Sequence, residues 1–247
     1  MKSAFFISDV HLNDKASHAR EALLHLLKRA QKEAELFVVV GDLFDLWVGR
    51  SPILQKKYFD VISEFAKLKK TCRLIYLEGN HDFHLKYFWN SNVGFEVYEG
   101  PANITFNNFK LRLEHGDESD LKDLGYIFLR KVLRTYPIKK LADLIPSSLV
   151  VKIGEKGSHA SRKYTDFLKD SKRVENILQG TRLHAAKVAA QNDFDLLITG
   201  HTHVADDYAF EVASKTRRLI NLGSWFEGPH FLEIDSSGQV SHHQIKI

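Results

Sequence analysis

Short apolar runs rich in β-branched and aromatic residues alternate along the chain with segments in which apolar residues recur every three or four positions. The runs have the length and composition of buried strands. They cover residues 4–8, 35–41, 73–79, 110–115 and 193–200. Helical spacing follows the first run at 19–30 and the second at 53–69. This alternation predicts parallel strands joined by right-handed crossovers.

The section 118–190 breaks this alternation. It is poor in strand patterns, its apolar residues have helical spacing, and Pro137 and Pro146 mark helix boundaries within it. Four short runs then predict a set of antiparallel strands and a second sheet packed on the first, at 208–213, 217–222, 230–235 and 239–245. The predicted fold is an α/β sandwich whose core comprises 1–117 and 191–247, with 118–190 inserted as a helical cap.

Composition narrows the class of protein without naming a function. A chain of 247 residues with 44% hydrophobic and 27% charged residues is typical of one large globular domain, neither disordered nor fibrous. No run approaches the ~20 apolar residues that a membrane-spanning helix needs. Cys72 is the single cysteine, which excludes an internal disulfide and is consistent with a reducing cytoplasm.

Positive charge is concentrated in one part of the chain. The net charge is +4, yet residues 130–163 hold nine Lys or Arg against only Asp143 and Glu155. This basic block is typical of proteins that bind phosphate, nucleic acid or an anionic membrane surface. A solvated helix face would give the same pattern.

Polar side chains with metal-binding chemistry follow five of the predicted strands. Because ligands bind beyond the carboxyl ends of parallel strands, we expect these five clusters to meet at one site. Carboxylates, imidazoles and one carboxamide, without a thiolate, suit Mn, Fe or Zn rather than an iron–sulfur cluster. The clusters are Asp9 and His11, then Asp42, then Asn80 to Asp82, then His115, and finally His201 and His203.

These blocks resemble the motifs of the calcineurin-like metallophosphoesterase superfamily, whose fold is a four-layer α/β/β/α sandwich. All five occur in order: Asp9-Val10-His11, Gly41-Asp42-Leu43-Phe44-Asp45, Gly79-Asn80-His81-Asp82, His115-Gly116-Asp117 and Gly200-His201-Thr202-His203. The resemblance implies two divalent cations. It assigns one to Asp9, His11, Asp42 and His203, and the other to Asp42, Asn80, His115 and His201. It also implies that His81 is the catalytic proton donor and that Asp82 orients it.

The substrate is indicated by a narrower resemblance. The protein phosphatases of the superfamily carry Arg-Gly after the second Asp of the Gly-Asp-x-x-Asp block, whereas Leu46 and Trp47 follow Asp45 here. Almost the whole chain is instead similar to the UDP-2,3-diacylglucosamine pyrophosphatases of lipid A synthesis. The similarity implies a manganese-dependent, peripheral inner-membrane hydrolase on the cytoplasmic face in Gram-negative bacteria. Such enzymes release UMP and 2,3-diacylglucosamine 1-phosphate.

The same similarity implies a set of substrate contacts. The basic block and the apolar faces of the cap would then hold pyrophosphate or headgroups and acyl chains, although those faces are equally typical of the cap's own core. One departure is His81, which stands where many of these enzymes have Arg. The implied contacts are Asn80, His81, Asp123, Ser158, Arg162, Lys163 and His201.

Two other classes of function remain open from the sequence. One is another enzyme of the superfamily, a phosphodiesterase, nuclease or nucleotide pyrophosphatase. Nucleic acid is disfavoured because the basic block carries few aromatic residues for base stacking beyond Tyr136 and Tyr164. The other is a non-catalytic scaffold, which should have lost a ligand or His81, and this chain retains all of them.

Overall fold

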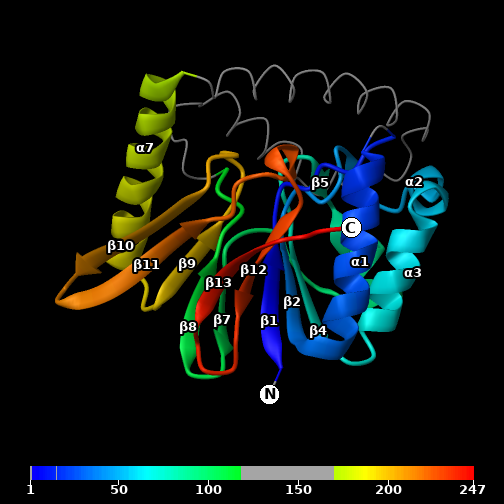
Figure 1. The fold of residues 1–247 in the computed structure, drawn as a ribbon, viewed down its shortest axis with the longest axis horizontal. Helices are drawn as coiled ribbons and strands as arrows, with labels where there is room; N and C mark the ends of the chain where they lie inside the picture. Colours follow the sequence, from blue (N-terminus) through cyan, green and yellow to red (C-terminus); the bar gives the residue numbers. More distant parts are fainter. Residues whose placement is uncertain (1, 15, 118–169) are drawn as a thin grey trace.

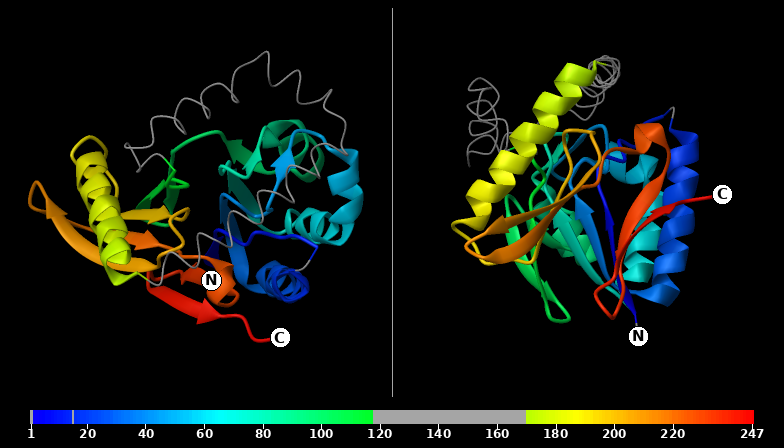
Figure 2. Two further views of the ribbon diagram at one scale, coloured as in Figure 1. Left: turned by 90° about the horizontal axis from the view of Figure 1, so that it is seen from above. Right: turned by 60° about the vertical axis from the view of Figure 1, so that its left-hand side comes forward.

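The computed structural model describes residues 2–14, 16–117 and 170–247, and in these ranges two β-sheets pack face to face between helices (Figure 1). Views from two further directions show the helices α1 and α3 on one side of the sheet pair and α7 on the other (Figure 2). The layers are therefore α/β/β/α, which is the predicted fold class.

The first sheet has six strands in the order β13-β12-β1-β2-β4-β6. Its strands β1, β2, β4 and β6 run parallel, while β12 runs antiparallel to both β1 and β13. Their bounds are β1 Ser3–Ile7, β2 Ala34–Val40, β4 Arg73–Leu77, β6 Glu96–Tyr98, β12 His230–Ile234 and β13 Val240–Gln244.

The second sheet has five strands in the order β10-β11-β9-β8-β7. The neighbours β8, β9 and β11 are parallel, and antiparallel hairpins add β7 and β10 at the edges. Their bounds are β7 Ala102–Phe106, β8 Phe109–Leu113, β9 Leu196–Thr199, β10 Asp206–Val212 and β11 Lys215–Asn221.

The remaining elements are helices and a short strand pair, β3 with β5. Helices α1 and α3 pack on the first sheet, and α7 packs on the second. The bounds are α1 Ser17–Glu33, β3 Trp47–Val48, α2 Pro52–Lys57, α3 Phe59–Leu68, β5 Asp82–Phe83, η1 Leu85–Tyr87, η2 Trp89–Val93, α7 Ser171–Ala189 and η3 Trp225–Glu227.

Alternation along each central strand divides its side chains between two cores. In β1, Phe5 and Ile7 pack beneath the helices, whereas Ala4 and Phe6 face the second sheet. Because successive side chains of a strand point to opposite faces, a fully apolar strand is required wherever both faces are covered. This accounts for the continuous apolar runs that predicted the central strands.

The five strands predicted before the polar clusters are confirmed as β1, β2, β4, β8 and β9. The helix predicted at 53–69 is present but divides at Tyr58 into α2 and α3. The Tyr58 hydroxyl donates to the carbonyl oxygen of Leu12 at 2.9 Å, which fixes this joint against the loop after β1.

The prediction that the strands after the insertion build the second sheet was only partly right. The second sheet contains β8 and β9 as well as β10 and β11, whereas β12 and β13 extend the first sheet beyond β1. Both faces of β12 are apolar, as a position beside β1 requires. Phe231 joins the core under the helices, and Leu232 joins the core between the sheets.

Helix α7 lies within the range 118–190 that was expected to form the insertion. Its residues Ala185 and Val188 pack against Phe194, Leu197 and Phe210 of the second sheet and its flanking loop. The predicted contacts Asp123, Ser158, Arg162 and Lys163 lie outside the described residues, as does the basic block. Among the described helices, none has the length and apolar character to cross a membrane.

Candidate metal centre

The predicted ligands lie on tight loops that leave the carboxyl ends of the strands. Five of the seven have a positive φ, between 50° and 68°. Residues other than glycine rarely adopt this region, and such strain is concentrated at functional sites. The backbone therefore turns sharply enough to direct side chains from both sheets toward one point. The five residues are Asp9, His11, Asp42, His201 and His203.

Two glycines allow these loops to approach one another. Gly41 has a φ of +82°, and a Cβ there would overlap the imidazole of His115. A Cβ on Gly200 would overlap the side chains of Ser8 and Asp9. The centre therefore depends on bare backbone at both positions, where loops of the two sheets come into contact.

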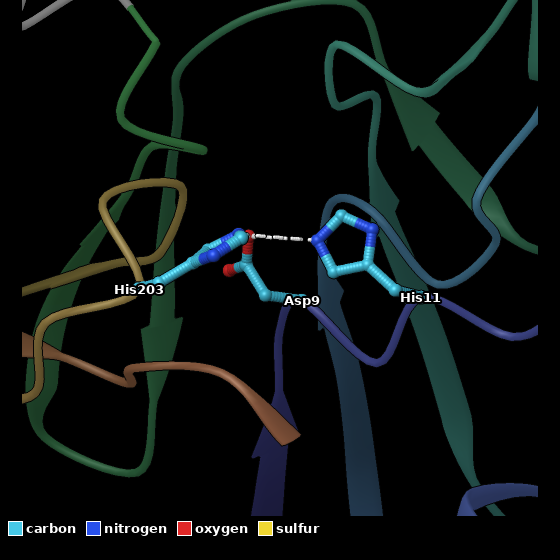
Figure 3. A group of neighbouring side chains, drawn as sticks. All are labelled: Asp9, His11 and His203. Carbon is cyan, nitrogen blue, oxygen red and sulfur yellow. Dashed lines mark hydrogen bonds and ion pairs between the residues drawn. The ribbon is translucent and has the colours of Figure 1, made fainter. Parts of the chain in front are cut away.

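The first group consists of Asp9, His11 and His203 (Figure 3). The Nε2 atoms of His11 and His203 are 3.1 Å apart. Asp9 Oδ1 lies 3.3 Å from His203 Nε2 and 3.7 Å from His11 Nε2. All three residues are less than 9% exposed. Three donor atoms thus converge from positions 192 residues apart in sequence.

The second group is built around the amide of Asn80. Its Oδ1 lies 3.0 Å from His115 Nε2 and 2.9 Å from His201 Nδ1. The other ring nitrogen of His115, Nδ1, lies 2.9 Å from the carbonyl oxygen of Val40. That contact fixes the ring so that Nε2 faces the centre.

Asp42 lies between the two groups. Its Oδ2 is 4.0 Å from His11 Nε2 and 3.5 Å from His115 Nε2. In each of the trios Asp9–His11–His203, Asp9–Asp42–His115 and His11–Asp42–His81, the ligand atoms lie within 4.8 Å of one another. One carboxylate therefore reaches both groups, as a bridging ligand must.

The buried carboxylates and imidazoles shift one another's protonation. Burial opposes the charged form of His11, but hydrogen bonds with Asp45 and Asp9 outweigh it and raise the pKa of His11 to about 10. Burial likewise opposes the charge of His115, yet the charge of Asp42 raises the pKa of His115 to about 10. Burial and the nearby His115 lower the pKa of His201 to about 4.

The two carboxylates respond in the opposite direction. Burial would raise the pKa of Asp9, but hydrogen bonds with His11 and His203 hold that pKa well below its usual value. The pKa of Asp42 is also lowered, because the charge of His115 outweighs the effect of burial. Positive charge is therefore strongly favoured at this point.

A divalent cation fits this set of side chains. Asp9 Oδ1 is buried and faces two imidazoles, with His203 Nε2 at 3.3 Å and His11 Nε2 at 3.7 Å. The pKa values of His11 and His115 are raised, and each ring in its protonated form supplies the positive charge that a cation would supply. Oxygen and imidazole donors without sulfur suit Mn, Fe or Zn. The two groups share Asp42 and together offer ligand atoms for divalent cations.

The comparison with known proteins agrees with this geometry. The family model described as calcineurin-like phosphoesterase matches residues 3–205. The chain belongs to the calcineurin-like phosphoesterase family. It is a hydrolase of phosphoesters, and the family implies that it uses divalent metal ions.

Relatives of known name align with the whole chain. A protein of Coxiella burnetii named UDP-2,3-diacylglucosamine hydrolase is 27% identical over 251 residues, covering 100% of this chain and 99% of that protein. One of the same name from Ectopseudomonas mendocina is 28% identical and covers 94% of both chains. A solved structure described as a novel archaeal phosphodiesterase is 13% identical, with a TM-score of 0.49, and covers 98% of this chain and 99% of that one.

Within this calcineurin-like phosphoesterase, His81 lies beside the metal groups. Its backbone N–H donates to Asp42 Oδ1 at 2.9 Å. Its Nδ1 lies 2.8 Å from the carbonyl oxygen of Asp45, so Nδ1 carries a proton and donates it there. Nε2 is then the ring nitrogen that this contact leaves available.

The structure gives Asp82 other contacts than the expected one with His81. The buried carboxylate accepts hydrogen bonds from the backbone amides of Asp42, Leu43 and Gly79 and from the Tyr76 hydroxyl, at 2.5–3.0 Å. Burial and the charge of Asp42 raise the pKa of Asp82 to about 7. Asp82 therefore holds two ligand-bearing loops together, and the ring of His81 is oriented by Asp45.

Sequence reasoning missed three residues at this centre. Asp45 places a carboxylate oxygen 3.4 Å from His11 Nδ1 and its carbonyl against His81. The position of Asp45, three residues after Asp42, was the signal in the sequence that could have identified it. Phe226 stacks on His11, with ring centroids 5.1 Å apart, and Trp225 donates its backbone N–H to the Asp9 carbonyl at 3.1 Å. The available signal for these two residues was their place in the turn that follows the predicted strand at 217–222, directly after Gly223 and Ser224.

Proposed function

We propose that this phosphoesterase hydrolyses the pyrophosphate of UDP-2,3-diacylglucosamine, giving UMP and 2,3-diacylglucosamine 1-phosphate for lipid A synthesis. The observation that carries the proposal is that the seven predicted ligands lie together in a chain that aligns, over 94–100% of its length, with hydrolases named for this substrate. Identities of 26–28% support the family more strongly than the choice of substrate.

Two manganese ions would complete the site. Asp9, His11, Asp42 and His203 would hold one ion, and Asp42, Asn80, His115 and His201 the other. When bound, such ions polarise the phosphoryl oxygens and lower the pKa of water. The lack of sulfur ligands supports a metal such as manganese over one that prefers thiolates.

The remaining groups of the centre would act on the phosphate directly. His81 presents Nε2 toward the substrate because Nδ1 is held by the Asp45 carbonyl. As an imidazolium it would donate a proton, or a hydrogen bond, to the departing bridge oxygen. The Asn80 amide and His201 would touch the phosphate as well as a metal ion. Water would attack the α-phosphorus, and the bridge oxygen would leave with the β-phosphate on the sugar.

The lipid end of the substrate is assigned to the insertion. Asp123, Ser158, Arg162 and Lys163 would contact the sugar phosphate there, and the helical apolar pattern of the predicted cap, 118–190, supports acyl binding. The basic block would hold the enzyme at the anionic surface of the inner membrane as a peripheral protein.

Hydrolysis in ¹⁸O-labelled water tests this proposal. The purified chain, loaded with manganese and given UDP-2,3-diacylglucosamine, should release UMP, and the label should appear in UMP rather than in the lipid phosphate. A parallel reaction with the Asp42→Ala variant sets the background. If no UMP is formed, or if single-stranded DNA or a simple nucleotide pyrophosphate is cleaved instead, the substrate assignment is wrong.

A further inference from the structure

A cavity of about 450 Å³ lies directly beside the metal centre. The cavity is lined by His11 and Asp45 of the metal centre, by the turn η3 with Gly228 and Pro229, and by His18 and Ala19 of α1. A ligand portion in this cavity would therefore be adjacent to a phosphate held at the centre. The volume lies in the range of small-molecule sites.

The turn η3 presents an aromatic ring and a carboxylate next to this cavity, beside a buried indole. Phe226 stacks on His11 at an interplanar angle of 7° and remains 38% exposed. Trp225 is buried, and its indole N–H has no hydrogen-bond acceptor in the described part of the chain. Glu227 is exposed and also lines the cavity, so it supplies carboxylate oxygens that accept hydrogen bonds.

The turn is held rigidly against the metal centre. The Trp225 backbone N–H donates to the Asp9 carbonyl, and Ser224 Oγ accepts the N–H of Phe226 at 3.3 Å. The ring of His230 lies between the Leu222 carbonyl, 2.6 Å from Nε2, and the Gly228 carbonyl, 2.8 Å from Nδ1. One side chain thus contacts both ends of the loop. A fixed aromatic ring costs little entropy when a ligand stacks on it.

We infer that this cavity binds the nucleobase end of the substrate, with the uracil ring on Phe226. Uracil is planar and carries an imide N–H, which match the exposed ring of Phe226 and the carboxylate acceptor of Glu227. An acyl chain would make no hydrogen bond with the Glu227 carboxylate, whereas the imide N–H of uracil would donate to it. The inference rests on the proposed function, because it assigns this cavity to the UMP half of UDP-2,3-diacylglucosamine.

The affinities of UMP and ribose 5-phosphate, measured by calorimetry on the manganese-loaded chain, isolate the contribution of the base. The wild type should bind UMP more tightly than ribose 5-phosphate. Phe226→Ala should reduce this preference roughly tenfold, because stacking on an aromatic ring contributes about 1–3 kcal/mol per base. Phe226→Leu should lose the preference as well, since it keeps apolar volume over His11 but has no planar ring.

Further variants separate the base from other occupants. Glu227→Ala should weaken UMP by about 2- to 10-fold through one lost hydrogen bond. Phe59→Ala alters a ring that is 70% exposed on α3 and should change neither affinity. Metal content, measured for each variant, identifies any loss that comes from a disturbed His11.

Three outcomes would overturn the inference. The wild type could bind both ligands equally, or its preference could survive in both Phe226 variants. Alternatively, Phe226→Leu could leave UMP affinity unchanged while Phe226→Ala weakens 2,3-diacylglucosamine 1-phosphate, which would assign the cavity to the lipid. Failure of the proposed function is a separate result, because it would appear as no UMP released from UDP-2,3-diacylglucosamine even where UMP itself binds on Phe226.

Discussion

The loops of the two sheets contribute chemically different side chains to the metal centre. The first sheet supplies Asp9, Asp42 and Asn80 together with His11 and His81, and so it brings all the predicted carboxylate ligands. The second sheet supplies imidazoles alone, from His115, His201 and His203. Neither set is a binding site for two cations by itself. The site exists only where the sheets meet, so its metal affinity depends on the packing of the whole sandwich.

The largest expected effect is from Asp42→Ala, because Asp42 is the carboxylate that reaches both groups. We expect both metal ions and all measurable hydrolysis to be lost. His203→Ala is the matched change on the second sheet, and it should weaken one ion while the other stays bound. Metal analysis after dialysis measures both. Two ions retained by the Asp42→Ala protein would contradict the bridging role.

The next effect is from His81→Ala, which removes the first-sheet imidazole that is assigned to the phosphate rather than to a metal. The rate should fall by ~10²–10⁴, with metal content unchanged. His81→Arg keeps a positive charge but has no proton to transfer near neutral pH. We expect it to preserve substrate affinity better than turnover, as seen in separate KM and kcat values. Unchanged turnover in His81→Ala would rule out its role.

Acid should weaken metal binding steeply. Metal ions bind neutral imidazole, and the metal-free pKa values of His11 and His115 are about 10, so both rings are protonated below that pH. Each must release its proton, which costs about tenfold in affinity per proton for every pH unit lowered. Between pH 8 and pH 6 the affinity should therefore fall by up to about 10⁴-fold. Calorimetry in buffers of different ionisation enthalpy measures the released protons directly, and no release would refute the prediction.

The contact between the sheets can be disturbed without touching a ligand. Gly41→Ala should destabilise the fold by about 1–3 kcal/mol, since its Cβ must displace the His115 ring and its φ is positive. Gly180→Ala is the control within α7, where a Cβ has nothing within 4 Å. It should stabilise the protein by about 0.5–1 kcal/mol. Urea denaturation of both variants measures the changes. Equal stability of the two would show that the Gly41–His115 approach is not tight.

Much of the fold was predictable because local pattern and burial coincide. Strands β1 and β2 bury apolar side chains on both faces of the sheet, and helix α1 buries one apolar face. Whether each segment is a strand or a helix, and where it lies in the chain, therefore followed from periodicity alone. The sheet assignment of β12 did not follow. Its alternation suits either sheet, and only the available edge of β1 decides between them.

The sequence by itself determined which side chains are the candidate metal ligands. A buried strand must end in a loop, and the first polar residues of that loop lie at the carboxyl edge of the sheet, so Asp9, Asp42 and His115 could be named without coordinates. Because these residues are carboxylates and imidazoles, they restricted the candidate metal ions to hard and borderline cations.

The tertiary structure decided how those side chains are arranged. The His201 backbone N–H meets Asp9 Oδ2 at 2.9 Å across 192 residues of sequence, a contact that depends on how two sheets pack. The same packing turns His81 toward the Asp45 carbonyl and lays Phe226 on His11. Such pairings are set by the shape of the whole core and the positions of its loops, which local periodicity does not encode. The sequence named the ligands, and the fold decided their neighbours.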